Sequence, residues 1–194
     1  MRVIRLAAAL CAALLATACL PVTSSVPVGS TVGFKPDSAL TGIWKGHGQT
    51  LTETTYFSFF PQQDGAITVL GQTPDGKDTG WGVYSVQTAA LGPYHFMNAR
   101  DISSDGKPVD AAEAQKTFPL LYKVNGDGAL VIYLLDEKKA GAAIKAGKIA
   151  GTIEPGQDGD IVLTAPAADL DAFFQTPDGR ALFVKPLAIL RREK

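Results

Sequence analysis

The amino-acid sequence predicts a mainly β (α+β) fold, an antiparallel barrel or sandwich of about eight to ten strands with two or three short helices. About ten short runs of β-favouring residues recur between Gly, Pro, Asn and Asp turn signals. Tight turns join several neighbouring runs, which favours antiparallel pairing. Three other segments have helix caps or apolar residues at helical spacing.

Five of the runs lie in the first half of the domain, at residues 41–47, 54–60, 66–72, 79–87 and 94–101. The second run contains four aromatic residues with apolar bulk on both sides, which predicts a strand buried on two faces. The third and fourth runs are joined by Thr73–Lys77. In this turn Pro74 presets φ and Gly76 suits the left-handed position, so a hairpin is predicted.

Five more runs follow at residues 120–124, 130–135, 149–154, 160–164 and 182–190. The first two meet across Asn125–Gly128 and the next two across Gly156–Gly159, turns whose composition is typical of hairpins. Pro186 interrupts the last run. Because proline has no N–H to donate to a sheet, this run is expected to be an edge strand or to contain a bulge.

The clearest predicted helix runs from Glu137 to Ala146, since Asp136 suits the N-cap and Gly147 ends the pattern. A second, short helix is expected after Asp110, with Glu113 at the capping-box position.

A third helix is expected over about residues 168–175, where Leu170, Phe173 and Phe174 form one stripe that faces the sheet. Its last residue begins the second copy of the pentapeptide Gln-Thr-Pro-Asp-Gly, whose first copy spans residues 72–76. The flanking residues differ, so the two copies are interpreted as turns of similar chemistry and not as a duplication.

The start of the chain has the organisation of a secretory signal. Two arginines precede an apolar run from Leu6 to Leu15, which is too short to cross a ~30 Å hydrocarbon core. Small residues at Ala16 and Ala18 suit cleavage, and the next residue is Cys19. The segment resembles the bacterial lipobox, in which that cysteine becomes the lipidated first residue. Simple secretion is the alternative.

The predicted organisation is a lipoprotein signal peptide at 1–18, the lipidated Cys19 with a flexible tether at 19–38, and one β-rich domain at 39–194. The tether is inferred from a Pro-, Ser-, Thr-, Val- and Gly-rich composition without a period. Cys11 lies in the removed segment, so Cys19 would be the only cysteine of the mature chain. The lipobox resemblance implies attachment to a bacterial envelope membrane through acyl chains. Leu20, in place of an acidic residue after the cysteine, resembles the pattern of lipoproteins passed to the outer membrane, which implies a place on its periplasmic face.

Charge excludes one class of partner. Loss of Arg2 and Arg5 with the signal leaves sixteen basic against nineteen acidic residues, so the mature net charge is −3. This balance, together with export, argues against nucleic acid. The length suits one domain that buries a core without metal or disulfides.

The sequence has no recognisable catalytic set. Two histidines, His47 and His95, exclude a three-histidine zinc site, and no G-x-S-x-G pentad is present. The paired aspartates fall in turns or near helix starts, where capping explains them: Asp75 with Asp78, Asp101 with Asp105, and Asp169 with Asp171. We therefore predict no enzyme activity, no metal and no cofactor, with carboxylate catalysis as the least favoured hypothesis.

Aromatic residues are concentrated in the first half of the domain. Filling of a β core is favoured, whereas lining of a cavity or anchoring of a protein partner are the alternatives. Under the cavity interpretation, the candidate ligand-binding residues are Trp44, Tyr56, Phe57, Phe59, Trp81 and Tyr84.

Gly42-Ile43-Trp44 resembles the G-x-W motif that opens lipocalin and related barrels. In that family the tryptophan closes one end of the barrel, and an arginine near the last strand packs over it. In this chain the resemblance implies that role for Arg191 or Arg192. The inserted helices and about ten strands depart from the eight-stranded pattern. The resemblance implies a binding or accessory module for a small apolar, lipid-like ligand. The alternative is a structural scaffold or inhibitor that acts on an envelope protein.

Overall fold

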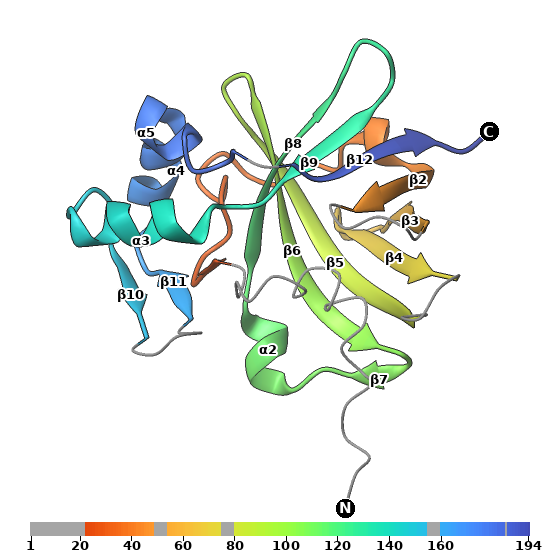
Figure 1. Cartoon of the computed structure of the whole chain (residues 1–194), viewed down its shortest axis with the longest axis horizontal. Helices are drawn as coiled ribbons and strands as arrows, with labels where there is room; N and C mark the ends of the chain where they lie inside the picture. The colour runs from red at the N-terminus through yellow and green to blue at the C-terminus, as the bar shows by residue number, and fades with distance from the viewer. Residues whose placement is uncertain (1–21, 49–53, 75–79, 155–159, 185) are drawn as a thin grey trace, which may run out of the picture.

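Eight antiparallel strands close into a barrel (Figure 1). The computed structural model describes residues 22–48, 54–74, 80–154, 160–184 and 186–194. Each barrel strand pairs with its neighbours in chain order, and the last strand pairs with the first, which closes the ring. The barrel strands are β2 (Gly42–Gly48), β3 (Thr55–Pro61), β4 (Ile67–Thr73), β5 (Gly80–Leu91), β6 (Tyr94–Ser104), β8 (Phe118–Val124), β9 (Leu130–Tyr133) and β12 (Pro186–Arg192).

The predicted fold class is confirmed, and the predicted runs overlap the eight barrel strands and two strands outside the barrel, although the last strand begins at Pro186 and not at Leu182. Two expectations about single strands can also be compared with the structure. The pairing of β12 with β9 shifts register between Pro186 and Ala188, so the predicted bulge is present. Burial of β3 on two faces is wrong, because Phe59 is 2% exposed whereas Phe60 is 49% exposed. On the outer face of this strand Ser58 is buried, whereas Phe60 is open to solvent.

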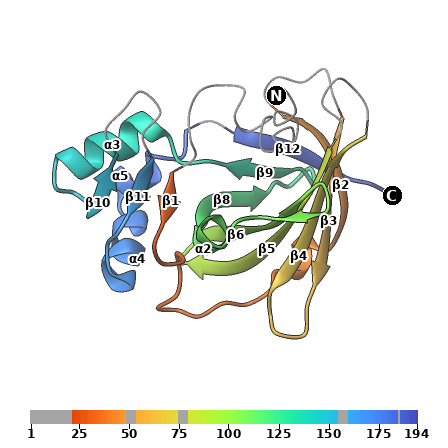
Figure 2. The same ribbon diagram turned by 90° about the horizontal axis from the view of Figure 1, so that it is seen from below.

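The two ends of the barrel differ. At one end, which we call the closed end, β2, β4, β6 and β9 begin and the 3-10 helix η1 (Ser38–Leu40) precedes β2. At the other, the open end, the same four strands finish. The short strand β7 (Lys107–Pro108) and the helix α2 (Ala111–Gln115) lie at the open end, between β6 and β8. In Figure 2 the barrel strands surround a common axis.

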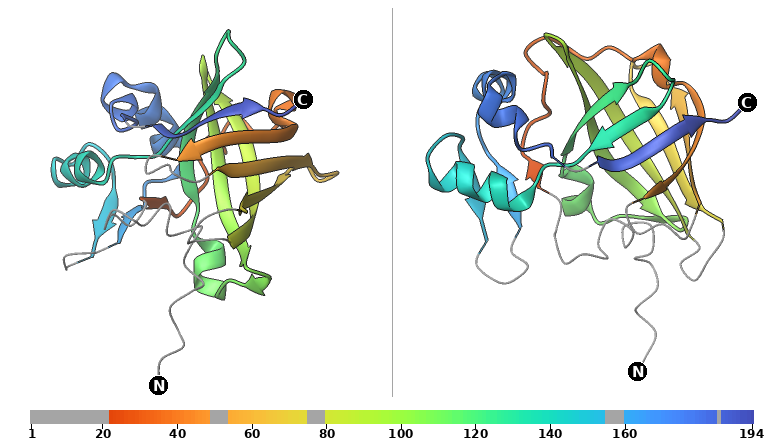
Figure 3. Two further views of the ribbon diagram at one scale, coloured as in Figure 1. Left: turned by 45° about the vertical axis from the view of Figure 1, so that its right-hand side comes forward. Right: turned by 45° about the horizontal axis from the view of Figure 1, so that its top comes forward.

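The segment between β9 and β12 forms a lobe on one side of the barrel (Figure 3). Its elements are α3 (Glu137–Lys145), β10 (Gly151–Ile153), β11 (Ile161–Leu163), α4 (Ala167–Gln175) and α5 (Pro177–Arg180). β10 and β11 form a three-stranded sheet with β1 (Thr23–Ser24), and β11 is its central strand. The three predicted helices are present as α2, α3 and α4.

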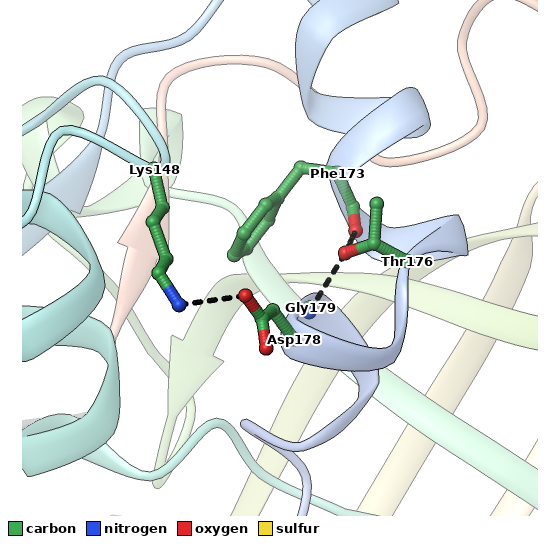
Figure 4. A network of polar contacts seen from close by, with 5 residues as sticks. All are labelled: Lys148, Phe173, Thr176, Asp178 and Gly179. Carbon is green, nitrogen blue, oxygen red and sulfur yellow. Dashed lines mark hydrogen bonds and ion pairs between the residues drawn. The ribbon is translucent and has the colours of Figure 1, made fainter.

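The helix α5 was not predicted, because it begins inside the second Gln-Thr-Pro-Asp-Gly copy, where we expected a turn. The Thr176 hydroxyl accepts the N–H of Gly179 at 3.1 Å and donates to the Phe173 carbonyl at 2.7 Å (Figure 4). Thr176 thus ends α4 and caps α5 with one side chain. Nearby, Lys148 pairs with Asp178 at 2.6 Å and ties α5 to the segment after α3.

Two hydrophobic cores result. One fills the barrel interior, and the other lies between the lobe and the outer wall of β5 and β6. Phe96 of β6 points out of the barrel and packs against Phe174 and Phe183, with ring centroids 5.8 and 5.9 Å apart. The lobe and the barrel therefore share a wall.

The prediction of a flexible tether over residues 19–38 is wrong from Val22 onward. Val22 and Val28 are buried in the lobe core. The Val28 N–H donates to the Asn98 side-chain oxygen at 2.7 Å, and the Asn98 amide donates to the Val28 carbonyl at 2.8 Å. The buried Asp171 carboxylate accepts the N–H groups of Gly29 at 2.6 Å and Thr31 at 3.2 Å. The signal peptide and Cys19 lie outside the described residues.

Candidate functional site: the barrel interior and its mouth

Trp44 seals the closed end. It is 1% exposed, and its indole N–H donates to the Leu40 carbonyl at 2.7 Å. The guanidinium of Arg192 lies 4.4 Å from the Trp44 ring centroid and donates to the carbonyls of Ala39, at 2.6 Å, and Thr41. Of the two arginines considered from the sequence, Arg192 thus packs over the tryptophan. Arg191 instead contacts Asp127 at 2.8 Å.

A polar contact fixes the segment before β2 to the opposite wall. The hydroxyl of Tyr122, a residue only 3% exposed, donates to Asp37 at 2.8 Å. Burial and this hydrogen bond to Asp37 raise the pKa of Tyr122 well above its usual range. Asp37 also accepts the N–H of Ala39 at 2.9 Å and so caps η1. The closed end is held by both packing and hydrogen bonds.

Side chains fill the barrel interior behind this seal. An eight-stranded barrel is just wide enough for its side chains to fill it, or for one small ligand. Here the inward-facing side chains near the closed end are less than a tenth exposed, which makes this half a core: Trp44, Phe59, Ile67, Val69, Val86, Met97, Tyr122, Leu130 and Leu190.

Not every side chain that packs against the barrel core is fully buried. Five side chains that pack against the barrel core are only partly buried, and we call this set the mouth: Phe57, Tyr84, Ala99, Leu134 and Leu187. Gly82 lies beside one of them, Tyr84. A Cβ at Gly82 would lie 2.7 Å from the Tyr84 hydroxyl oxygen, so the missing side chain leaves room for that ring against the wall. The mouth is a partly exposed, mainly apolar surface.

One carboxyl group borders the mouth. Asp101 of β6 is the register partner of Tyr84, next to the bulge between Val83 and Tyr84. Burial raises the pKa of Asp101, and the nearby Glu113 carboxylate raises it further. Glu113 is itself paired with Lys116 at 2.8 Å. An acid that is protonated more readily than usual therefore lies beside apolar side chains.

The six candidate residues from the sequence do not form one site. Trp44 and Phe59 are buried in the barrel core, whereas Tyr84 and Phe57, the register partner of Trp44, belong to the partly buried mouth. Tyr56 is next to Phe57 in the strand and faces the other way, because side chains alternate. The Lys45 ammonium lies 5.5 Å from the Tyr56 ring centroid.

Trp81 lies at the rim of the open end and is 41% exposed. Its carbonyl accepts the N–H of Asp105 at 2.8 Å, which joins β5 to the turn after β6. A shallow hollow of about 300 Å³ is lined by Gln72, Thr73, Pro74, Gly80, Trp81 and Asp105. This hollow is separate from the mouth residues.

Four neighbours of the candidate site were not predicted from the sequence: Ala99, Asp101, Leu134 and Leu187. Alternation along β6 from Met97 was a usable signal for Ala99. No local signal identifies the two leucines, since they come together only when β9 and β12 pair.

The two histidines belong to opposite ends of the barrel: His95 is near the start of β6 and His47 is near the finish of β2. The described residues contain no group of three or more His, Cys, Asp or Glu placed to hold a metal ion. Within the same part of the chain, no helix combines the length and apolar character needed to span a membrane.

These features define a class of protein: a closed antiparallel eight-stranded barrel with one end sealed by Trp44 and a packed lateral lobe. No protein-family model, curated protein or solved structure matches the chain.

Proposed function

We propose that the protein is a membrane-anchored cell-envelope lipoprotein whose barrel is a binding or accessory module for a small apolar, lipid-like ligand. The observation that carries this proposal is the difference between the two halves of the barrel interior. Apolar side chains are buried near the sealed end and stay partly exposed in the mouth. Concave, mainly apolar surfaces with a few polar groups are typical ligand sites.

The filled half limits what the mouth accepts. Because Trp44, Phe59 and Leu130 occupy the interior near the closed end, a ligand has only the open half to enter. This arrangement suits the end of one apolar chain better than a large ring system. Asp101 adds a polar partner for a hydroxyl or amine at the entrance. The proposal includes no catalytic step.

Binding can be tested with residues 19–194 carrying Cys19→Ser, a chain that retains every described element. We expect the fluorescent fatty acid cis-parinaric acid to bind saturably. Ala99→Leu fills the mouth and is expected to weaken this binding by about tenfold, equivalent to about 1.4 kcal/mol. Ala90→Leu, at an exposed alanine on β5, makes the same change outside the mouth and should alter binding less than about twofold.

Non-saturable binding, or equal effects of the two leucine variants, would rule out the mouth as the binding site.

The exposed Trp81 beside the shallow hollow favours the second candidate function, a scaffold or inhibitor that contacts an envelope protein. A photo-crosslinking residue placed at Trp81 in intact cells should then trap one reproducible partner. The same residue at the exposed Ile189 on the barrel wall should not.

The anchor is tested separately by the intact mass of the protein taken from its native membrane. We expect a chain that begins at Cys19 and carries diacylglycerol and acyl mass. Cys19→Ser should release the protein into the soluble fraction. An unmodified mass would disprove the lipoprotein part of the proposal and leave the binding test unaffected.

A further inference from the structure

The chain is fixed to the fold only three residues after the proposed lipid attachment. Val22 is 3% exposed in the lobe core. Thr23 and Ser24 pair with Val162 and Leu163 of β11, and the Ser24 N–H donates to the Thr117 carbonyl at 2.8 Å. An extended chain spans about 3.3–3.6 Å per residue, so Cys19 lies within about 11 Å of Val22. A lipid on Cys19 keeps the folded domain at the membrane.

The fixed point lies on the side of the open end. Thr117 directly precedes β8, a strand that begins at the open end. β1 runs parallel to β11, so the chain before Thr23 leads toward Ile161, at the start of β11, and its register partner Ile153. Figure 2, the view from below, shows β1 between β11 and the barrel strand β8.

An ion-pair cluster joins the elements around this point. Lys116, at the end of α2, contacts Glu113 at 2.8 Å and Asp160, just before β11, at 2.9 Å. These contacts bridge the lobe and the open end of the barrel, and they raise the pKa of Lys116, with Glu113 as the largest cause. The start of β1 and the open end of the barrel are therefore linked through this ion-pair cluster.

Both ends of the barrel have exposed apolar side chains, so these residues alone do not show which end faces a membrane. The side of the anchor has Trp81, Ile102 and Ile153, which are 41%, 45% and 38% exposed. The closed end has Phe60 and Val124, which are 49% and 41% exposed. The position of the anchor decides between them. Trp81 then occupies the headgroup region, where an amphipathic indole is favoured.

From this placement we infer that the open end of the barrel faces and contacts a phospholipid surface, with Trp81 at the contact and the mouth directed toward the bilayer. The inference rests on the proposed lipid anchor and deepens the proposed function, because an apolar chain would pass between bilayer and mouth with little exposure to water. The sealed end, with Trp44 and Arg192, faces away from the membrane.

The acylated protein tests this orientation directly, since Cys11 is removed and Cys19 is blocked. A cysteine in place of the exposed Lys107, on β7 at the open end, or of the exposed Gly126, in the β8–β9 turn at the closed end, is then the only free thiol. Each variant is labelled with a bimane fluorophore and placed in vesicles of phosphatidylethanolamine and phosphatidylglycerol. Lipid with a spin label on its headgroup serves as the quencher.

We expect at least about threefold stronger quenching for Lys107→Cys than for Gly126→Cys, because membrane-bound quenchers act over short distances. Insertion of about twelve Gly and Ser residues between Leu20 and Pro21 lengthens the link to about 50 Å at most and should remove the difference. Equal quenching without the insertion, or stronger quenching at Gly126→Cys, would overturn the inferred orientation.

Failure of the orientation and failure of the proposed function are distinguishable. If intact mass shows no acyl group on Cys19, both the proposed anchor and the inferred orientation are wrong. If acyl mass is present and the quenching difference is absent, only the orientation is wrong. If the quenching difference is present while cis-parinaric acid does not bind, the open end faces the membrane without serving as a ligand site.

Discussion

Arg192 shows how one side chain can complete a distant structure. It lies in the last strand, yet its guanidinium covers Trp44 and donates to carbonyls on both sides of Leu40. The carbonyls of η1 and Thr41 precede the barrel and have few ladder partners, so a planar donor with several N–H groups suits them. The arginine thereby joins the two strands that meet at the ring closure.

We expect Arg192→Ala to lower the free energy of unfolding by about 1–2 kcal/mol, from the lost cation–π contact and hydrogen bonds. Urea unfolding followed by tryptophan fluorescence measures this loss. Arg191→Ala is the matched control, because Arg191 contacts the exposed Asp127 on the surface and its loss should matter less. A greater loss for Arg191→Ala would show that the tryptophan contact is unimportant.

The segment from Val22 to Asp37 shows where local sequence is insufficient. Its composition is that of a linker, but backbone groups of Val28 and Gly29 are hydrogen-bonded to side chains far along the chain, Asn98 and Asp171. Gly29 has a φ of +85°, and a Cβ there would overlap the Cβ of Ala89. The segment therefore lies directly on β5. No local sequence pattern predicts a hydrogen-bond partner about 140 positions away.

Asp171→Asn tests this docking. An amide presents only one acceptor oxygen to the N–H groups of Gly29 and Thr31, so docking should weaken by about 1–3 kcal/mol. Amide hydrogen exchange over residues 22–31 should accelerate while barrel strands stay protected. Asp169→Asn, at an exposed position in the first turn of α4, should leave exchange unchanged. Equal protection in both variants would mean that other contacts hold the segment.

Strands and hairpins were predictable because their signals are local. Alternating runs, the N-cap Asp136 and the bulge at Pro186 all act within a few residues of where they occur. The mouth was not predictable, since Phe57, Ala99 and Leu187 come from three strands that meet only on closure. The anchor at Cys19 and ligand binding stay predictions.

The barrel and the lobe share the wall that contains Phe96, so we expect them to unfold together. A partly buried acid beside the mouth, Asp101, should make the stability of this unit depend on pH. The folded-state pKa of Asp101 is raised, so the folded protein binds a proton there more tightly than the unfolded chain. Stability from this group is present below the unfolded pKa and is lost as pH rises through the folded pKa.

Asp101→Asn is therefore expected to unfold at higher urea concentration than the wild type at pH ~7, with the advantage declining toward pH ~3. Asp127→Asn should behave oppositely. The N–H of Ala129 and the guanidinium of Arg191 lower the pKa of Asp127, so that group stabilises at neutral pH and loses this effect as pH falls through its folded pKa. Parallel pH profiles for the two variants would contradict this assignment.

The pairing of β12 with β2 also sets the order of events during synthesis. Gly48, at the finish of β2, and Pro186, at the start of β12, are 138 positions apart. At about 5–20 residues per second, β2 waits roughly 7–28 s for its partner. Until then β2 and β9 each keep an unpaired edge that another chain can join. Closure of the ring removes these edges from the native barrel, but it requires β12. The nascent chain is therefore vulnerable to aggregation until its last strand has been made.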